Sequence, residues 1–383
     1  MRISIIGPAY PLRGGIAHHV YWLRGELTTR GHSVQVVSFS KLYPRIFFPG
    51  TTELDTISDL KLDAQAVPIL TLLNPLTWLR ALRLVRNFSP HAIVFQWWQP
   101  FFGPLVGTLA RSLRRPGAPR IIECHNVFPH EASLFDRMLT RFALSAADHL
   151  ITHSQRDREL LLSVLPDKTV SVSALPSLDE FSDRRATARD GRTILFFGKV
   201  RKYKGLEVLL AAMPKVLTKV ECKLSIVGEF YDSLNRYRRL IHEYRIESHV
   251  RIDNRYIPNE EVTRVFREAD VLVMPYVTAS QSGVARIALS NGLPIIASRI
   301  GGLSEAIDEN LTGLLVPPGD PDALADRIVD YFSGNLGPTF SENIRRKVNE
   351  PSPCQIGEII EDVMLRGLSA ETFSNPNSFD RAS

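Results

Sequence analysis

The stretch from Met274 to Gly319 decides the fold: MPYVTASQSGVARIALSNGLPIIASRIGGLSEAIDENLTGLLVPPG. A buried strand is followed by a loop of small and polar residues and then by a helix, which Gly292 ends. Residues 294–297 read as a second short strand, and Gly301-Gly302 begins a second helix with Glu305 in its first turn. Two helix N-termini with unpaired N–H groups would suit a diphosphate. The alternative is an ordinary α/β crossover whose glycines serve packing.

The start of the chain predicts a second α/β unit. Residues 3–6 form a short apolar strand, and a turn-rich loop containing Gly14-Gly15 follows. A helix with apolar residues at helical spacing comes next, and residues 34–37 read as another strand. This order is half of a doubly wound parallel sheet. The Gly14-Gly15 pair therefore lies where a backbone can approach a phosphate.

Length and composition indicate two α/β domains without a membrane span. The chain has 383 residues and a formal charge of +5, a mild excess that favours anionic ligands or a membrane surface but does not argue for nucleic acid. Its three cysteines form no CxxC pattern, which argues against a disulfide framework or a zinc site and fits a reducing cytosol. The first residues lack a signal-peptide core. Residues 92–110 carry no charge, but Gln, Pro and Gly interrupt them, so we expect a strand, a loop and a helix there. We therefore expect a cytoplasmic protein.

A cluster of cations lies between a predicted strand at 193–198 and a predicted helix at 206–216. It consists of Lys199, Arg201, Lys202 and Lys204. Such a run is usually a solvated face, but here it follows a strand end and precedes a helix start, which favours phosphate binding.

Polar and aromatic side chains at strand ends of the first half are candidates for ligand contacts, because open α/β sheets bind ligands there. Trp97 either stacks on a sugar or lipid or belongs to the core and its rim. His125 follows the strand at 121–124, with Asn126, His130 and Glu131 as weaker neighbours. His130 or Glu131 could orient an acceptor hydroxyl or take its proton.

Two segments of the first half leave a membrane role open. Residues 41–73 read as a variable crossover or as an acceptor or membrane loop. A helix beginning at Asn74-Pro75 is predicted to place leucines at 76, 79 and 82 on one face and arginines at 80, 83 and 86 on the other. It is either a basic membrane-surface element or an outer helix packed on the sheet.

These motifs together resemble the retaining glycosyltransferases of family 4. Residues 292–297 (GLPIIA), Gly301-Gly302, Glu305 and 312–317 (TGLLVP) are similar to the family's donor-binding signature. Residues 198–205 (GKVRKYKG) are similar to its G-R-L-x-x-x-K-G motif, with Lys199 at the arginine position. Gly14 to Val20 and the segment at 148–154 are similar to its N-terminal motifs.

The resemblance implies the GT-B fold, an α/β arrangement of two facing Rossmann-like domains with parallel sheets and an interdomain cleft. We place the acceptor-side domain at residues 1–176, a linker at 177–191 and the nucleotide-sugar donor domain at 192–345. Residues 346–383 would hold a C-terminal helix that crosses back to the first domain, and then a disordered tail from 369.

One feature departs from the family. Its members usually carry two glutamates eight positions apart, and those places hold Ala279 and Ile287 here. The chain instead reads Ser280-Gln281-Ser282-Gly283, which resembles a divergent branch. The departure puts recognition of the ribose and of the sugar hydroxyls in doubt and leaves the phosphate-binding architecture in place.

By resemblance, the activity is retaining, metal-independent transfer of a sugar from a nucleotide-diphosphate donor to a hydroxyl of a glycan or lipid-linked acceptor. No cofactor and no metal ligand is expected. His125, Lys204 and Arg201 would be catalytic, and Trp97, Asn126, His130 and Glu131 would bind the acceptor. The donor would be held by Gly14, Gly15, Lys199, Arg201, Lys204, Glu229, Tyr256, Ile257, Ser280, Gln281, Ser282, Gly283, Gly302 and Glu305.

Two other classes of function stay open. The missing glutamates are compatible with a non-catalytic relative that binds a nucleotide or serves as a partner subunit. A nucleotide-sugar epimerase or a phosphorylase on the same fold would react without an acceptor hydroxyl or with free phosphate. Contact with an anionic membrane at the inner face is a further expectation, and binding of nucleic acid is not expected.

Overall fold

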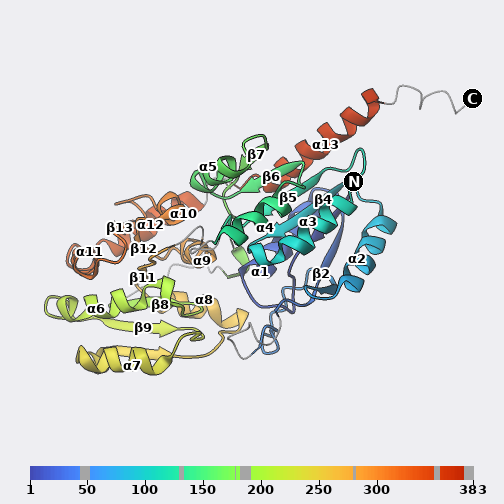
Figure 1. Cartoon of the computed structure of the whole chain (residues 1–383). Helices are drawn as coiled ribbons and strands as arrows, with labels where there is room; N and C mark the ends of the chain where they lie inside the picture. Colours follow the sequence, from blue (N-terminus) through green and yellow to red (C-terminus); the bar gives the residue numbers. More distant parts are fainter. Residues whose placement is uncertain are drawn as a thin grey trace, which may run out of the picture. The chain divides into compact units, whose positions relative to one another are not determined.

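A computed structural model shows two compact α/β units (Figure 1). It describes residues 1–43, 52–128, 133–176, 178–181, 191–278, 282–348 and 354–374. The first unit comprises Met1–Thr56, Lys61–Ala174 and Pro353–Ser383, and the second comprises Ile57–Leu60 and Leu175–Ser352. The chain therefore leaves the first unit near residue 174 and returns to it near residue 353.

The first unit is built on a parallel sheet of seven strands in the order β3-β2-β1-β4-β5-β6-β7. The chain order of strands alternates with helices, as a doubly wound sheet requires. The strands are β1 (Arg2–Ile6), β2 (Ser33–Lys41), β3 (Val67–Thr71), β4 (Ala92–Trp97), β5 (Arg120–Cys124), β6 (His149–Thr152) and β7 (Val170–Val172). The helices are α1 (Gly15–Thr29), α2 (Pro75–Phe88), η2 (Pro100–Phe102), α3 (Gly103–Ser112), α4 (Leu134–Leu144), α5 (Gln155–Val164) and α13 (Ile356–Ser374).

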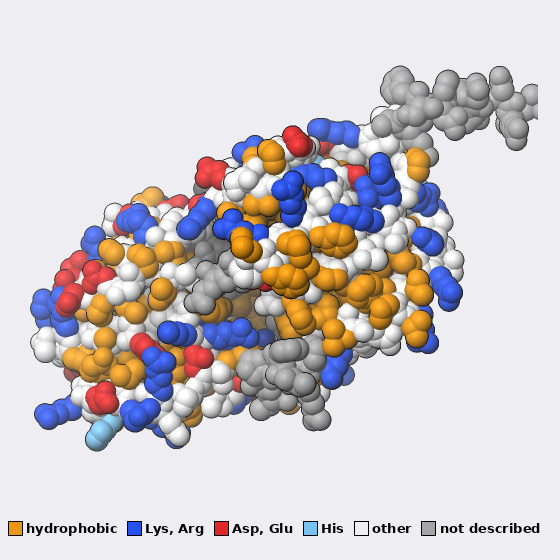
Figure 2. All heavy atoms as spheres, in the orientation of Figure 1, with side chains coloured by type: hydrophobic (Ala, Val, Ile, Leu, Met, Phe, Trp, Pro, Cys, Tyr) orange, Lys and Arg blue, Asp and Glu red, His pale blue; other side chains and the backbone are white. Residues whose placement is uncertain are grey.

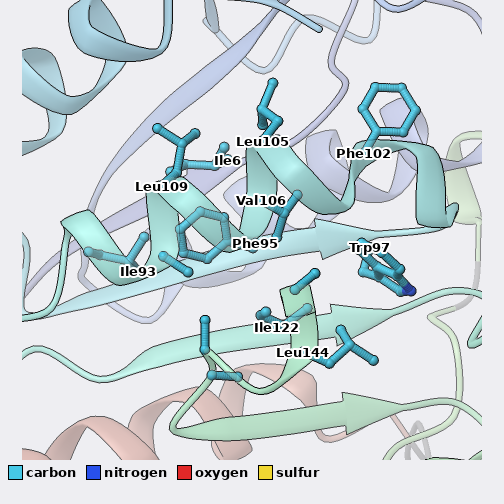
Figure 3. Close-up of a cluster of buried hydrophobic side chains, with 14 of the residues drawn as sticks. Ile6, Ile93, Phe95, Trp97, Phe102, Leu105, Val106, Leu109, Ile122 and Leu144 are labelled. Carbon is cyan, nitrogen blue, oxygen red and sulfur yellow. The ribbon is translucent and has the colours of Figure 1, made fainter. Parts of the chain in front are cut away.

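Alternate side chains of the central strand β4 enter two separate cores. Ala92 and Val94 pack in the core that also contains residues of α1 and α13. Ile93, Phe95 and Trp97 pack in the core that also contains residues of α2, α3 and α4, part of which is drawn in Figure 3. A strand buried on both faces reads as a continuous apolar run, which is why the segment from residue 92 looks like part of a membrane span in sequence.

The C-terminal helix α13 belongs to the first unit. Ile356, Ile360 and Met364 are completely buried against α1 and the strands. Glu361 lies 3.0 Å from Arg30 and 2.8 Å from His32, both near the end of α1. The last helix thereby covers one face of the first sheet.

The second unit has a parallel sheet of six strands in the order β10-β9-β8-β11-β12-β13. Its strands are β8 (Thr193–Phe197), β9 (Lys223–Val227), β10 (Val250–Asp253), β11 (Val271–Met274), β12 (Ile295–Ser298) and β13 (Gly313–Val316). Its helices are η3 (Asp179–Phe181), η4 (Lys202–Lys204), α6 (Leu206–Leu217), α7 (Leu234–Glu243), η5 (Glu247–His249), α8 (Asn259–Arg267), α9 (Gly283–Ser290), α10 (Gly301–Ala306), α11 (Pro321–Ser333) and α12 (Gly337–Val348).

The structure corrects several local expectations. The segment at 41–73 contains an edge strand, β3, and α12 had no counterpart in the sequence reading. Helix α13 extends to Ser374, into the stretch expected to be a disordered tail.

Helix α2 also differs from the expected pattern. Its buried face is formed by Thr77, Ala81, Leu82 and Val85, whereas Leu76 and Leu79 are exposed. The predicted alignment of all the leucines on one face was therefore wrong. Among the described residues, none of the helices is long and apolar enough to cross a membrane.

Candidate functional site

The two central strands of the second unit, β8 and β11, lie side by side although they are far apart in sequence. From β8 the chain continues outward through β9 and β10 on one side, and from β11 through β12 and β13 on the other. The carboxyl ends of such a neighbouring pair form the switch point where doubly wound sheets bind ligands. Of the predicted donor-binding residues of this half, Lys199, Arg201 and Lys204 follow β8, and Ser282 and Gly283 follow β11.

Glycine permits an unusually close approach of the loops at this switch point. Gly205 has a φ of 68°, and a Cβ there would overlap the carbonyl oxygen of Pro275, which follows β11. A Cβ on Gly228, after β9, would likewise overlap the carbonyl oxygen of Gly198, after β8. The Val277 N–H also donates to the Tyr203 carbonyl across 2.8 Å. The segments after β8, β9 and β11 are thereby fixed against one another.

Lys204 is the most unusual cation of this region. Its side chain is only 6% exposed, and its Nζ lies 3.5 Å from the carbonyl oxygen of Phe197 and 5.5 Å from the ring centre of Tyr276. Burial, followed by the positive charges of Lys199 and Arg201, lowers the pKa of Lys204 to about 7. Burial among like charges disfavours the charged ammonium, so an arriving anion would stabilise its charged form.

Arg201 and Lys199 lie near the same aromatic ring. The Arg201 guanidinium is 4.8 Å and the Lys199 ammonium 5.5 Å from the ring centre of Tyr231. Arg201 Nε is buried and finds no hydrogen-bond partner among the residues that the structure describes. Lys202, by contrast, is exposed. The structure thus brings the predicted cations Lys199, Arg201 and Lys204 together. Among the described residues, the buried Nε–H of Arg201 is a donor without a hydrogen-bond partner.

The loop between β11 and α9 holds the next part of the predicted set. Ser282 takes the N-cap position of α9 and Gly283 is its first residue, while Ala279, Ser280 and Gln281 lie outside the described residues. Tyr276 is buried, and burial raises the pKa of its hydroxyl. Ile287, at one usual glutamate position, is buried on α9. Helix α9 has eight residues, about two turns.

The second predicted helix start, at Gly301-Gly302, begins only a short helix. Helix α10 has six residues, Gly302 is buried, and Glu305 is exposed near the helix end instead of in its first turn. The expectation that Glu305 lies in the first turn was therefore wrong, because the helix begins at Gly301 and Glu305 is its fifth residue.

Three further predicted donor residues follow β9 and β10. Glu229 is half-buried, and its carbonyl accepts from the Val200 N–H at 2.9 Å. Ile257 is buried and Tyr256 is half-buried in the segment between β10 and α8. All three lie at the carboxyl edge of the sheet, where the sequence placed them.

In the first unit, Gly14 and Gly15 form the N-cap and first residue of α1, after β1. Gly14 has a φ of 129°, and a Cβ on Gly15 would meet no atom within 4 Å. The backbone at this helix start is therefore accessible to a ligand, as the sequence predicted for a glycine pair after the first strand.

His125 belongs to a buried network that the sequence analysis did not foresee. Its Nε2 lies 2.5 Å from Oε1 of Gln96, and Nε2 of Gln96 donates to Oε2 of Glu123 at 2.9 Å. Oε1 of Glu123 lies 2.8 Å from Nε2 of His19 and 3.5 Å from Nε2 of His153. The network therefore holds one completely buried carboxylate among three imidazoles and one amide.

The charges of this network fix the orientation of its members. Burial by itself raises the pKa of Glu123, but His19, His125 and His153 outweigh it and hold the pKa well below its ordinary value. An ionised carboxylate only accepts, so the Gln96 amide must turn its NH₂ toward Glu123 and its oxygen toward His125. Burial, and then the charge of His19, lower the pKa of His125 well below its ordinary value. A neutral His125 that donates from Nε2 has an acceptor at Nδ1.

The same network contains the residues best suited to a metal ion. His19, Glu123 and His125 each offer a ligand atom, and these atoms lie within 4.8 Å of one another. Among the residues that the structure describes, these three side chains form the one group of potential metal ligands that is compact enough to hold an ion. Gln96 hydrogen-bonds to both Glu123 and His125, and Oε1 of Glu123 lies 2.8 Å from Nε2 of His19.

Of the predicted acceptor-binding residues, the structure describes Trp97 and Asn126. Trp97 has no exposed surface, because it points into the core between β4 and α3 (Figure 3), so it offers no face for stacking and is a core residue. Asn126 is half-buried directly after His125. His130 and Glu131 lie outside the described residues.

A sequence signal for the network did exist. Gln96, Glu123 and His125 alternate with apolar residues along β4 and β5, so they share one face of the sheet with period two. His153 directly follows β6, and His19 lies on α1 within the motif from Gly14 to Val20. Only the sheet order brings these segments to one place.

Two family models match the chain, one in each unit. The model described as "Glycosyl transferase 4-like domain" matches residues 14–172, and the one described as "Glycosyl transferases group 1" matches residues 191–333. The first match includes the histidine network around Glu123, and the second includes the cations Lys199, Arg201 and Lys204.

Curated relatives are similar over parts of their length. A D-inositol 3-phosphate glycosyltransferase of Corynebacterium glutamicum is 30% identical over 295 residues, which are 68% of this chain and 70% of that protein. An uncharacterized glycosyltransferase of Methanocaldococcus jannaschii is 32% identical over 143 residues, 37% of this chain and 36% of that protein. Other relatives are aligned over about half of their own length or less; the gpi3 subunit of the Schizosaccharomyces pombe phosphatidylinositol N-acetylglucosaminyltransferase, at 25% identity, is aligned over 49%.

Solved structures share the fold over nearly the whole chain. Sucrose-phosphate synthase from Thermosynechococcus elongatus has a TM-score of 0.73 at 20% identity, with 97% of this chain and 99% of that chain covered. The Anabaena HepE protein in complex with UDP-glucose has a TM-score of 0.72 at 13% identity, with 96% and 99% covered. At such identities the similarity shows the fold alone.

Proposed function

This chain belongs to the family-4 type of glycosyltransferases with the GT-B fold, and on that basis we propose that it moves a sugar from a nucleotide-diphosphate donor to a hydroxyl of a glycan or lipid-linked acceptor, with retention at the sugar carbon. The observation that carries the proposal is the cation group at the β8 end. Lys204 is buried there with a pKa near 7, and Arg201 presents a buried Nε without a partner in the described residues.

The chemical problem in such a transfer is the charge that grows on the departing diphosphate. Fixed cations aimed at that charge lower the barrier, because they need no reorganisation when the bond breaks. Lys199, Arg201 and Lys204 supply this charge. Arg201 can bind two phosphate oxygens at once, and Lys204 acts as a point charge. Because these cations are part of the chain, we propose that transfer is independent of a divalent metal ion.

We propose that the acceptor attacks from the face that the diphosphate leaves. The bond between the sugar carbon and the phosphate oxygen breaks, and the bond from the acceptor oxygen to the same carbon forms. The acceptor proton passes to the departing phosphate oxygen, so no protein carboxylate is needed as a nucleophile. His125 positions the donor sugar near its 6-hydroxyl, and the network through Gln96 and Glu123 holds the ring in one tautomer.

The remaining donor and acceptor contacts extend this proposal. Gly14 and Gly15 approach a phosphate through their backbone, and the loop from Ser280 to Gly283 contacts the diphosphate. Glu229, Tyr256, Ile257, Gly302 and Glu305 complete the donor set, with Tyr256 and Ile257 beside the base. Asn126, His130 and Glu131 contact the acceptor. We also propose that the protein works in the cytoplasm at the inner face of a membrane, where lipid-linked acceptors are found.

The first experiment is titration calorimetry with UDP, GDP and ADP in the presence of a chelator. Lys204→Ala is the test variant, and Lys202→Ala is its matched control, because Lys202 lies two residues away and is exposed. We expect one nucleotide to bind and Lys204→Ala alone to lose it. Binding that requires a divalent metal would contradict metal independence, and equal binding by Lys204→Ala would contradict the assigned site.

Turnover then separates the classes of function. With the sugar-linked form of the nucleotide that binds and a panel of hydroxyl acceptors, we expect release of nucleoside diphosphate only when acceptor is present, and a product with the donor's anomeric configuration by NMR. Conversion of the donor to its epimer without acceptor would indicate an epimerase. Tight binding without turnover on any acceptor would favour a non-catalytic subunit.

A further inference from the structure

The outer surface of three neighbouring helices in the first unit carries an unusual set of side chains. Helices α2, α3 and α4 cover one face of the seven-stranded sheet, and α3 packs against both of the others. Figure 2 shows hydrophobic side chains gathered over this surface, with lysine and arginine side chains among them. We call the outward side of α2, α3 and α4 the α2–α4 face. Its large exposed apolar residues include Leu76 and Leu79 of α2 and Leu134, Phe135 and Met138 of α4, and the exposed Leu73 lies just before α2.

These apolar residues are exposed to a degree that is unusual for their size. Leu134 is 86% exposed, Phe135 62% and Met138 57%, all on α4. Leu76 is 65% exposed on α2. Scattered single residues of this kind need no explanation, but a contiguous patch marks a surface that another body covers.

The charges on the same helices are almost all positive. Their sequences contain a single acidic residue, Asp136, and that carboxylate is engaged in a capping box with Ser133 at the start of α4. The arginines of the three helices are Arg80, Arg83, Arg86, Arg111, Arg137 and Arg141. The whole chain, by comparison, has 46 basic and 41 acidic residues, so the imbalance belongs to this face.

The three helices form one firm platform. Gly107 of α3 leaves room for the ring of Phe142 on α4, and the Arg111 guanidinium lies 4.2 Å from the centre of that ring. Arg86 of α2 donates to the carbonyl of Ser112 at the end of α3, at 2.8 Å. Arg86 and Arg111 are thus used inside the platform, and Arg80, Arg83, Arg137 and Arg141 remain on its exposed side.

We infer that the α2–α4 face docks on the surface of an anionic lipid bilayer. A strip of leucine, phenylalanine and methionine beside arginines is the pattern of helices that lie in the interface plane with their apolar side in the acyl boundary. Arginines at that depth meet lipid phosphates, and each one near an anionic leaflet contributes about fivefold to binding.

A second copy of this chain is a poorer occupant. An isologous dimer would set the same arginines against their own copies, with one capped aspartate to offset them. An anionic bilayer satisfies both the charges and the apolar strip. The inference deepens the proposed function, because it names the surface that would bring the enzyme to a lipid-linked acceptor.

The test is co-sedimentation with vesicles, without donor or acceptor. One set of vesicles contains phosphatidylcholine alone, and the other contains phosphatidylcholine mixed with phosphatidylglycerol. The charge variant is Arg137→Glu with Arg141→Glu, and the apolar variant is Phe135→Ser with Met138→Ser. The matched controls are Arg238→Glu with Arg239→Glu, two exposed arginines on α7, and Leu311→Ser, an exposed leucine of the second unit. All substituted side chains are exposed, and thermal unfolding verifies that each variant folds.

We expect wild type to bind the mixed vesicles in preference to pure phosphatidylcholine, with binding that weakens as salt is added. The charge variant should bind at least about tenfold more weakly, since two arginines are lost. The apolar variant should also lose binding, and both controls should keep it. No binding by wild type, or equal binding by wild type and the charge variant, would overturn the inference.

A dimer that dissociates in the apolar variant, seen by sedimentation equilibrium without vesicles, would overturn it in favour of a second copy. Failure here is distinguishable from failure of the proposed function, because vesicle binding needs no nucleotide. If the protein binds nucleotide and turns over but does not bind vesicles, only the proposed docking of the α2–α4 face on a bilayer is refuted.

Discussion

Gln96 and Glu123 are register partners on the neighbouring parallel strands β4 and β5, and the Gln96 amide donates to the Glu123 carboxylate at 2.9 Å. Paired positions of parallel strands project their side chains to the same face. Gln96 thereby links a completely buried carboxylate to His125, which directly follows β5. Gln96 hydrogen-bonds to both Glu123 and His125, so a change at one of these three side chains should affect the other two.

Glu123→Gln should destabilise the first unit strongly. The new amide would place a donor against the Gln96 NH₂ or the His19 Nε2–H, and loss of one partner of a buried charge pair typically costs about 3–5 kcal/mol. Thermal unfolding measures the loss. The exchange Gln96→Glu with Glu123→Gln moves the charge by one strand while each hydrogen bond keeps a donor and an acceptor, so it should recover part of the stability. A double variant no better than the single one would contradict the assigned amide orientation.

His125 should be neutral and should carry its proton on Nε2. The ionised Glu123 fixes the Gln96 amide, whose oxygen then needs a donor from His125. Nitrogen-15 NMR of labelled histidine distinguishes the two tautomers. Because the pKa of His125 lies well below its ordinary value, the ring should stay neutral as the pH falls through about 6.5, where an exposed histidine titrates. A Nδ1–H tautomer, or an ordinary titration, would be the contrary result.

Lys204→Met should separate binding from stability. Methionine fills a similar volume without a charge, so removal of a buried ammonium should leave the free energy of unfolding unchanged or raise it. Binding of the nucleoside diphosphate should fall by at least about tenfold, since a charge-assisted contact contributes about 1.5–3 kcal/mol. Calorimetry and denaturant unfolding give the two readouts. A variant that binds normally, or that fails to fold, would argue against a ligand-directed role for Lys204.

Binding of the nucleotide sugar should tighten as the pH falls toward 7. Lys204 has a pKa of about 7 without ligand, so its charged form is present below pH 7 and is lost above it. The diphosphate favours the charged form of Lys204, so above pH 7 Lys204 should take up a proton when the nucleotide sugar binds. The affinity should therefore fall about tenfold for each pH unit above 7. The sugar-linked nucleotide is the right probe, because a terminal phosphate itself titrates near about pH 6. Calorimetry in buffers of different ionisation enthalpy counts the proton, and Lys204→Met should abolish its uptake.

Gly205→Ala should destabilise the second unit by more than about 2 kcal/mol. Its φ of 68° is strained for alanine, and the new Cβ would overlap the carbonyl oxygen of Pro275. Gly283→Ala is the matched control, because a Cβ there would meet no atom within 4 Å. Thermal unfolding of the two variants should differ clearly. Equal stability would show that the loops after β8 and β11 can separate at little cost.

Much of the fold was predictable because its signals are local. Apolar runs predicted β1 at residues 3–6, β5 at 121–124, β8 at 193–198 and β12 at 294–297, close to their observed bounds. Helix α10 shows the limit, because nothing in the sequence of Gly301-Gly302 says that the helix ends after six residues. The short β3 and the helix α12 were missed, since an edge strand and an amphipathic polar helix produce weak patterns.

The candidate site divides in the same way. The cations Lys199, Arg201 and Lys204 lie within six residues of sequence, so their position between a strand and a helix could be predicted from the sequence. Trp97 was not, because the sequence does not say which face of β4 meets α3 and which meets α1. Its burial is a consequence of period two combined with the helices that cover each face.

The sequence by itself determined the alternation of strands and helices, the two α/β units and the cation group after β8, because each depends on residues that are neighbours along the chain. Only the tertiary structure decided that His19, Gln96 and His153 surround the Glu123 carboxylate, and that α2 and α4 leave leucines and a phenylalanine exposed. Those facts depend on the order of strands in a sheet and on which helix covers which face. Such long-range pairings are set by the packing of segments that are more than a hundred residues apart, as His19 and Glu123 are.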